Sequence, residues 1–503
     1  MAKQKIALQY SGFVVFSARL VSVITGLAFN LMVARSAVIT PTVDEYGVWG
    51  NLYQILLPYF TLFSGVIPFW ALRFVAREKE GAVKTGVFAN TLVAVVAAAV
   101  YVSLIPLLTS LFKAEAYTLV YAIAALQIVE MYLISVLEAC TQAQKPQYVG
   151  YGFIVGDACR VLLGFVFMIV LKQSLLGAIL SIVIASAIKV LFYSNVLITE
   201  FKQRVNFNYI REWLKGSTFN LYNLLGDRIA ATIFLMMSHY GGQTAQGYYT
   251  ASMFVATVVT YSSTLAFALY PKLLAESNLE DATTSLKMVL MFAVPMAAGV
   301  IGLADSYLMI QDVSYVVAEP VIITLAVDSL ILTLSSIYYY VLLGIEKVDE
   351  KAEIPFRQVA RSKLFIVFSL PYAHSAITLP TTFYIINNFA QNDPLLITTS
   401  AVLINTIAHL AMFIVLYLIV RKATKVIVPY KNIVKYIFAS AVMAVILRLI
   451  SHPTTIMLTL VVTAIGGITY MSILLTIDGE ARTLAFTILR ELERKLGILK
   501  SEG

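Results

Sequence analysis

A stretch of about 20 apolar residues, the length that crosses a bilayer as an α-helix, recurs about fourteen times along this chain. Of the 503 residues, 60% are hydrophobic and 13% are charged, whereas about 25% of the residues in a soluble domain are charged. Fourteen spans with short loops use most of the length and leave no room for a separate soluble domain. The sequence therefore predicts an all-α polytopic membrane protein.

Every span is predicted to be helical, because backbone polar groups in hydrocarbon need partners within their own segment. The stretch at 364–387 is the least regular, since Pro371, His374 and Pro380 interrupt it. We expect spans at about 9–36, 48–71, 86–111, 118–140, 149–171, 174–198, 214–238, 247–270, 286–304, 317–344, 364–387, 396–420, 432–450 and 456–476.

Lysine and arginine are concentrated in alternate loops. With a cytosolic N-terminus, 28 of the 36 basic residues lie in cytosolic segments, four lie on the opposite side and four lie within spans. Cytosolic loops of membrane proteins carry such an excess, so we predict a multi-pass protein of the cell (plasma) membrane with both termini in the cytosol. The same distribution accounts for the net charge of +8 through contact with membrane lipids, and no nucleic-acid partner is expected.

The spans divide into two similar halves. Gly47-Val48-Trp49 follows the first span, and Gly247-Tyr248-Tyr249 follows the seventh. Six spans in each half give both halves the same polarity, which predicts a pseudo-two-fold axis along the membrane normal and a substrate site between two lobes. The predicted parts are an N-terminal lobe (1–200), a cytosolic interlobe loop (201–216), a C-terminal lobe (217–421), two further helices (422–477) and a cytosolic amphipathic tail (478–503) that Asp478 caps.

Ionisable residues inside the predicted spans are the candidates for function. A charge at the bilayer centre costs about 2.5–3.5 kcal/mol, so such residues must face a protein interior or a wet cavity. Glu138 and Lys189 lie near a cytosolic boundary, where their side chains can reach water. The nine residues are Arg19, Glu130, Glu138, Asp157, Arg160, Lys189, Asp227, Arg228 and Asp328.

Spacing suggests partners for some of these charges. Asp157 and Arg160 are three residues apart and can pair on one helix, either as a structural clasp or as part of a cavity. Asp227 and Arg228 are adjacent, so their side chains diverge by about 100°. Each of these two needs another partner, and Asn220 and Asn223 precede them in the same span.

The remaining charges suggest a binding site. Arg19 and Arg228 lie in the first and seventh spans and together could hold an anionic group. The alternative is that Arg19 pairs with an acid such as Asp328 or Glu130. These two acids could instead carry a coupling proton or sodium ion.

Enzymatic chemistry finds no support in the sequence. His239, His374, His409 and His452 are scattered without metal-binding spacing, and no Walker loop is present. No nucleophile with a positioned base is recognisable. We therefore expect a protein that is not an enzyme and that has no catalytic residues, no metal and no cofactor.

Short motifs carry a resemblance to a known family. The first runs from Ala18-Arg19-Leu20 through Ala34-Arg35 to Asp44-Glu45-Tyr46-Gly47-Val48. The second is Leu224-Leu225-Gly226-Asp227-Arg228 followed by Gly247-Tyr248-Tyr249, and the third is Tyr315-Val316 with Leu343-Gly344-Ile345-Glu346-Lys347. They resemble the polysaccharide flippase family of the multidrug/oligosaccharidyl-lipid/polysaccharide (MOP) exporter superfamily.

The resemblance implies a V-shaped transporter that works by alternating access without ATP, and we expect it to be a monomer. Its substrate would be a polyprenyl-(pyro)phosphate-linked oligosaccharide moved from the cytosolic to the outer leaflet. The motif match gives Arg19, Arg35 and Arg228 the role of binding the anionic substrate, and Asp227 that of their acidic partner. Glu130, Asp157, Arg160 and Asp328 would supply cavity charge or ion coupling.

The number of spans departs from the family pattern and keeps other functions open. Many polysaccharide flippases have twelve spans, whereas fourteen are typical of peptidoglycan-precursor flippases. The alternatives are a cation-coupled multidrug antiporter of the same superfamily and a membrane-embedded glycosyltransferase or polymerase. Such an enzyme usually needs a sizeable extramembrane loop with acidic residues, and the predicted outer segments are short.

Overall fold

A computed structural model describes most of the chain. The described residues are 2–39, 48–49, 51–111, 114–276, 279–311, 313–346, 357, 361–391, 393–424, 426–450, 453–484 and 486–487.

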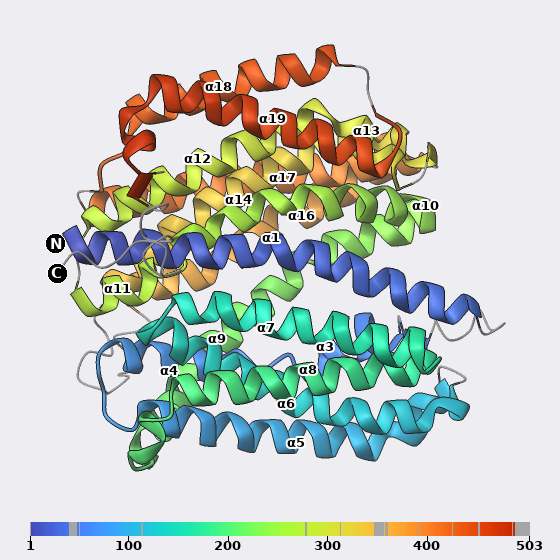
Figure 1. The fold of residues 1–503 in the computed structure, drawn as a ribbon, viewed down its shortest axis with the longest axis vertical. Coiled ribbons are helices and arrows are strands. Elements are labelled where there is room, and N and C mark those ends of the chain that lie inside the picture. Colours follow the sequence, from blue (N-terminus) through green and yellow to red (C-terminus); the bar gives the residue numbers. More distant parts are fainter. Residues whose placement is uncertain are drawn as a thin grey trace. The chain divides into compact units, whose positions relative to one another are not determined.

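Every regular element of the described residues is helical (Figure 1). Most of the predicted spans follow continuous helix, but the span at 48–71 is divided among a π segment and short α-helices. The spans at 214–238 and 247–270 each cross a turn between helical segments. The polytopic all-α fold is therefore confirmed. The principal helices are α1 (Ala2–Ile39), α3 (Leu57–Phe60), α4 (Val66–Ala76), α5 (Ala82–Leu111), α6 (Thr118–Gln144), α7 (Gln147–Gly164), α8 (Ser174–Val196), α9 (Phe207–Ala230), α10 (Thr232–Ala256), α11 (Leu269–Glu276), α12 (Glu280–Gly302), α13 (Ala304–Met309), α14 (Glu319–Ile345), α16 (Lys363–Phe389), α17 (Pro394–Ala423), α18 (Tyr430–Leu449) and α19 (Ile456–Ile477). Shorter 3-10 and π segments are η1 (Asn51–Leu56), η2 (Glu115–Tyr117), η3 (Phe165–Val170), η4 (Glu200–Lys202), η5 (Thr257–Ala266) and η6 (Val313–Ala318).

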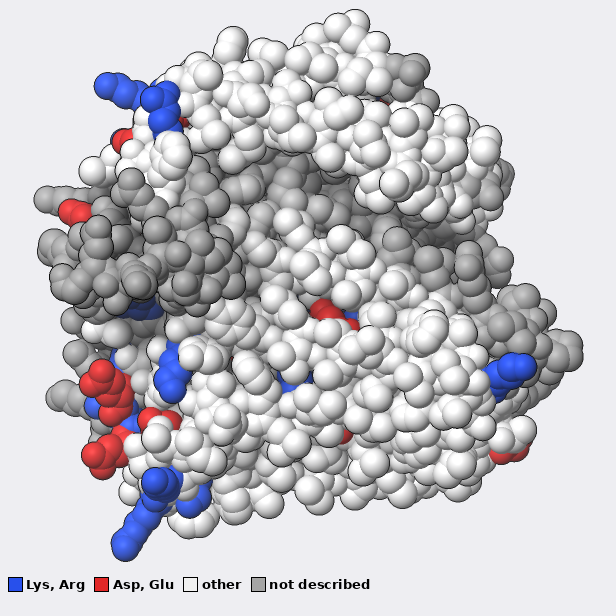
Figure 2. All heavy atoms as spheres, viewed as in Figure 1, with Lys and Arg blue, Asp and Glu red and all other residues white. Residues whose placement is uncertain are grey.

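Eleven helical segments of the described chain are long and apolar enough to cross a membrane. On the face drawn in Figure 2, the charged side chains gather toward the ends of the helices, and most of the surface between them carries no charge. This arrangement is typical of a multi-pass membrane protein, in which the uncharged band faces hydrocarbon.

The chain forms two compact units, each with its own packing. The first, called the N-unit here, comprises 14–220 with 347–359, and the second, the C-unit, comprises 1–13, 221–346 and 360–503. Helices α18 and α19 belong to the C-unit. The predicted lobe boundaries and the symmetry between lobes stay predictions.

The N-unit is built on α5, α6, α7 and α8. Helix α6 packs against α5 and α8, and α7 packs against α8 (Figure 1). Its largest apolar cluster places Tyr101, Tyr121 and Tyr132 among aliphatic side chains such as Leu52 and Ile128. The hydroxyls of Tyr101 and Tyr132 each donate to a backbone carbonyl, which lets these polar groups lie in an apolar core.

The C-unit is built on α10, α12, α14, α16 and α17. Helix α17 packs against α10, α14 and α16, and α18 packs against α12 and α19 (Figure 1). Helix α17 begins sharply because Asp393 accepts hydrogen bonds from the N–H groups of Leu395 and Leu396, both at 3.0 Å, with Pro394 at the first helical position.

Two irregularities interrupt the C-unit helices. Gly242 has φ 65° inside α10, a conformation that only glycine adopts without strain. The backbone therefore breaks shortly before Gly247, where the sequence motif predicts a turn. Helix α16 continues through Pro371 and Pro380, so the least regular predicted span is nevertheless one helix.

The predicted C-terminal tail begins as expected and then leaves the described residues. Asp478 accepts a hydrogen bond from the Glu480 N–H at 3.1 Å, as an N-cap does. Residues 488–503, which hold most of the predicted amphipathic helix, lie outside the described part.

Candidate functional site

Three basic side chains of the N-unit lie within its predicted spans, and two of them meet at one aromatic ring. The Arg19 guanidinium of α1 lies 3.8 Å from the centroid of the Phe153 ring on α7. The Lys189 ammonium of α8 lies 4.6 Å from the same centroid. Lys189 also pairs with Glu138 of α6 at 2.5 Å. We call Arg19, Glu138, Phe153 and Lys189 the N-unit charge cluster. That Glu138 and Lys189 reach boundary water stays a prediction, whereas their pairing is a tertiary contact that sequence reasoning did not foresee.

The predicted pairing of Asp157 with Arg160 is present. The Arg160 Nη2 atom lies 3.0 Å from Asp157 Oδ1 within α7, and the guanidinium lies 5.3 Å from the Phe29 ring centroid. This pair neutralises its own charge, which is what a clasp requires.

Glu130 of α6 has a different environment. Its Oε2 atom is buried and has no hydrogen-bond partner among the described residues. One turn earlier, Gln127 bonds the Tyr53 hydroxyl, and the Tyr53 ring stacks on Trp49 with centroids 4.0 Å apart. Glu130 is thus a half-buried acid without an ion-pair partner in the described structure.

Asp227 and Arg228 lie near the end of α9 in the C-unit, and both are exposed. The Asn223 amide donates to Asp227 at 3.2 Å, as the span sequence predicts. Neither Arg228 nor Arg19 forms an ion pair with a described acid, in contrast with Arg160 and Lys189. Arg35 lies in α1, and its side chain is outside the described part, as are residues 44–47 of the first motif.

A second polar cluster lies inside the C-unit, and sequence reasoning missed it. Asp328 of α14 accepts from His409 Nδ1 of α17 at 2.7 Å. The His374 ring of α16 stacks on the His409 ring, with centroids 4.8 Å apart and planes 23° apart. Asn405, one turn before His409, has its amide nitrogen 3.4 Å from His409 Nδ1. We call these four residues the histidine cluster.

The charges of the histidine cluster favour the binding of one added proton and disfavour a second. Both ring nitrogens of His374 are buried, and Asn405 lies near them without a hydrogen bond of good geometry. Two imidazolium ions 4.8 Å apart would repel each other by about 3 kcal/mol at an effective dielectric constant of about 20. One positive charge, in contrast, is balanced by Asp328. In sequence the two histidines are 35 positions apart, so no local motif could reveal the cluster.

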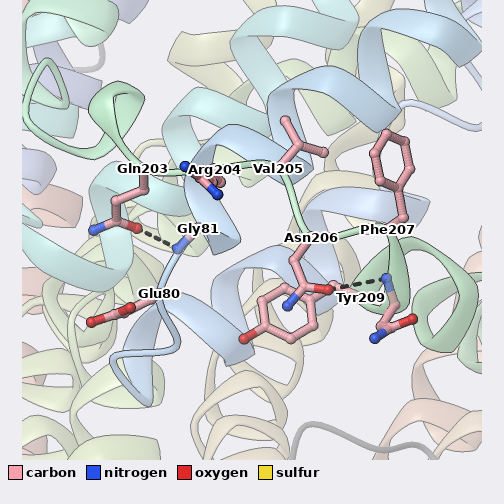
Figure 3. A pocket seen from close by; sticks show the side chains of 9 residues that line it. Glu80, Gly81, Gln203, Arg204, Val205, Asn206, Phe207 and Tyr209 are labelled. Carbon is pink, nitrogen blue, oxygen red and sulfur yellow. Dashed lines mark hydrogen bonds between the residues drawn. The ribbon is translucent and has the colours of Figure 1, made fainter.

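The described residues contain no group of three or more His, Cys, Asp and Glu side chains arranged to hold a metal. A surface cavity of about 620 Å³ lies elsewhere in the N-unit, where residues 203–209 meet Glu80 and Gly81. Figure 3 shows Gln203 turned toward Gly81, whose N–H donates to it. The Asn206 side chain accepts from the N–H of Asn208 at 3.0 Å. This cavity contains no predicted site residue.

No known family model and no curated protein matches the sequence. Solved structures do match the fold. The crystal structure of MATE in complex with MaL6 has a TM-score of 0.64 at 12% identity, covering 84% of this chain and 97% of that chain. An outward-facing multidrug resistance MATE family transporter of the MOP superfamily has a TM-score of 0.60 at 15% identity, covering the same shares. A MOP superfamily transporter from Pyrococcus furiosus has a TM-score of 0.61 at 13% identity, covering 82% of this chain and 95% of that chain.

The chain has the MOP transporter fold. The similar structures include MATE family transporters, and at these identities the likeness concerns the fold alone. The expected superfamily fold is therefore confirmed, whereas membership of the polysaccharide flippase family stays a prediction.

Proposed function

We propose that this MOP-fold protein is a flippase for a polyprenyl-(pyro)phosphate-linked oligosaccharide or polysaccharide repeat unit. It would move the lipid-linked glycan from the cytosolic to the outer leaflet by alternating access. The observation that carries the proposal is the state of Arg19 and Arg228. Both lie in predicted spans, and neither has an acidic partner in the described structure.

An unpaired guanidinium inside a membrane protein is costly unless an anion or water balances it. Arginine binds phosphate through two parallel N–H donors, so a lipid phosphate is a suitable counter-ion. The Phe153 ring beneath Arg19 would hold the guanidinium while the binding site is empty. Arg19 belongs to the N-unit and Arg228 to the C-unit, so each unit carries one such arginine.

A multidrug antiporter is the second candidate, because similar structures include a multidrug resistance MATE family transporter. A cationic drug would need carboxylates such as Asp227, Glu130 or Asp328, and it would gain nothing from Arg19. In the Pyrococcus furiosus transporter of the MOP superfamily, a reverse polarity of the binding pocket suggests a different function. Pocket polarity is thus the property that distinguishes the two candidates.

The test measures which leaflet holds the lipid-linked glycan in cells depleted of the protein and complemented with variants. We expect accumulation in the inner leaflet on depletion. Arg19→Ala or Arg228→Ala should slow flipping about 10- to 100-fold, because a hydrogen bond to a charged group contributes about 1.5–3 kcal/mol and about 1.4 kcal/mol corresponds to tenfold.

Arg448→Ala is the matched control, because Arg448 pairs with Glu319 at a helix end and should change the rate less than about twofold. Normal outer-leaflet glycan after depletion would refute the flippase proposal. Cationic-drug efflux that survives both arginine substitutions would favour the antiporter.

A further inference from the structure

We propose that the histidine cluster is a proton-binding site through which proton entry is coupled to transport. This inference rests on the proposed transport function but names its driving ion independently of the substrate. One proton would be shared by His374 and His409 and balanced by the Asp328 carboxylate. Its release to the other side of the membrane would complete one transport cycle.

The geometry defines the charge states of the site. His409 Nδ1 lies 2.7 Å from Asp328 Oδ1, so the imidazole N–H donates to the carboxylate and leaves Nε2 as the position that gains or loses a proton. His374 stacks on this ring, and its buried ring nitrogens lie near Asn405 without a hydrogen bond of good geometry to any described residue. The site therefore carries one negative charge when both rings are neutral and no net charge after binding one proton.

Other ionisable groups do not compensate this charge. The charged or titratable groups that act electrostatically on His374 are His409 and Asp328, with Asn405 as a polar neighbour, and Tyr249 of α10 acts on Asp328. The remaining charged residues of the packed helices lie toward helix ends, and His239 of α10 is exposed. These end residues are Glu280, Asp281 and Lys287 of α12, Glu319 of α14, Lys363 of α16, and Arg421 and Lys422 of α17.

A row of buried polar side chains, His374, Thr378 and Thr382, runs along α16, and we call this row the file. Thr378 and Thr382 follow His374 at intervals of four residues and so lie on the same helix face. Both are fully buried, and neither hydroxyl has a hydrogen-bond partner among the described residues. Some other buried helical threonines bond the carbonyl four residues earlier, as Thr333 and Thr406 do, whereas the Thr141 hydroxyl of α6 is also unpartnered among the described residues. Unpartnered buried polar atoms in a row are suited to hold water, which can carry protons to His374.

The file ends at an apolar plug. Ile386, one turn beyond Thr382, packs with Met237 of α10 and Ile397 of α17 in a hydrophobic cluster. In the predicted topology, this end of α16 faces the outside. The prolines on either side of His374, Pro371 and Pro380, remove backbone hydrogen bonds and permit α16 to bend. Movement of the Ile386 segment would open the file toward the outside.

The proton balance of the cycle is simple. A hydronium ion in the file gives one proton to an imidazole nitrogen lone pair and leaves water. The site then becomes neutral, which lowers the cost of enclosing it in an apolar environment. When the C-unit opens toward the cytosol, the imidazolium returns that proton to water.

Nuclear magnetic resonance of the full-length protein, labelled with ¹⁵N in its histidine rings and held in lipid nanodiscs, tests proton binding without any glycan. The chain has four histidines, so single His→Gln variants assign every signal. We expect His374 and His409 to titrate together and to take up one proton in total. Asp328→Asn should weaken that uptake about tenfold or more, because it removes the opposite charge. His239→Gln is the control and should leave the pair unchanged.

Cysteine labelling tests the file. A membrane-impermeant thiosulfonate reagent added from outside should modify Thr378→Cys at least about tenfold faster when Ile386→Ala is also present, because the smaller side chain opens the plug. The matched control, Thr333→Cys, should not respond to Ile386→Ala, since Thr333 is equally buried but bonded to a carbonyl. Independent titration of the two histidines to full double protonation, or a titration unchanged by Asp328→Asn, would overturn the proposal. Neither result would bear on which substrate is flipped, and a failed flipping assay would leave both results standing.

Discussion

The ion pair between Lys189 and Glu138 gives a sharp test of how charge is held in the N-unit. The Lys189 ammonium lies 2.5 Å from Glu138 Oε1, and the two side chains are only 16% and 24% exposed. Glu138→Gln would leave the ammonium without its counter-charge. Breaking a fully buried pair costs about 3–5 kcal/mol, and because some water reaches this pair, we expect a loss of about 2–3 kcal/mol in the free energy of unfolding.

Removing both charges should recover most of the lost free energy of unfolding. In Glu138→Gln/Lys189→Met neither side chain is charged, so we expect a deficit below about 1 kcal/mol and a coupling energy of about 2 kcal/mol. The control is Arg448 with Glu319, which are 3.1 Å apart and whose side chains are 48% and 35% exposed. Exposed pairs contribute about 0.2–1 kcal/mol, so the same double-mutant cycle should give a coupling energy in that range.

The protein offers its own probe for this measurement. Cys140 is fully buried two positions from Glu138, so its thiol should react with a fluorogenic maleimide only on unfolding. A Cys159→Ser background removes the partly exposed thiol. Unfolding by titration with a denaturing detergent then gives the free energies. A double variant as unstable as Glu138→Gln alone would refute the reasoning, because the cost would then not arise from an uncompensated charge.

Two further predictions concern pH and packing. Burial raises the pKa of a carboxyl, but hydrogen bonds from Asn432, Lys435 and the backbone outweigh it and lower the pKa of Asp478 below 3.8. This carboxylate should therefore stabilise the fold at pH values above 3.8, and the difference in unfolding free energy between the natural protein and Asp478→Asn should vanish as the pH falls through the lowered pKa. Gly152→Ala would place a Cβ against the Tyr193 ring and should cost about 1–3 kcal/mol; an unchanged unfolding free energy would show that the two helices separate easily.

Periodicity and local spacing were sufficient to predict the helices and the contacts within one helix. Most predicted spans are continuous helix, and Asp157 and Arg160 form the pair that their spacing predicts. Contacts between different helices could not be predicted from the sequence. From the sequence, Lys189 and Glu138 are each predicted to reach toward water. The residues around each of them give no sign that α6 and α8 bring the two side chains together.

The sequence by itself determined that this chain crosses a membrane many times and which charges lie within the spans. Hydrocarbon imposes both results on any segment of this length and polarity. Only the tertiary structure decided which of those charges are neutralised and that His374 and His409 stack beside Asp328. The physical reason is that a helix fixes neighbours three or four residues apart, whereas partners on different helices depend on how whole apolar faces pack.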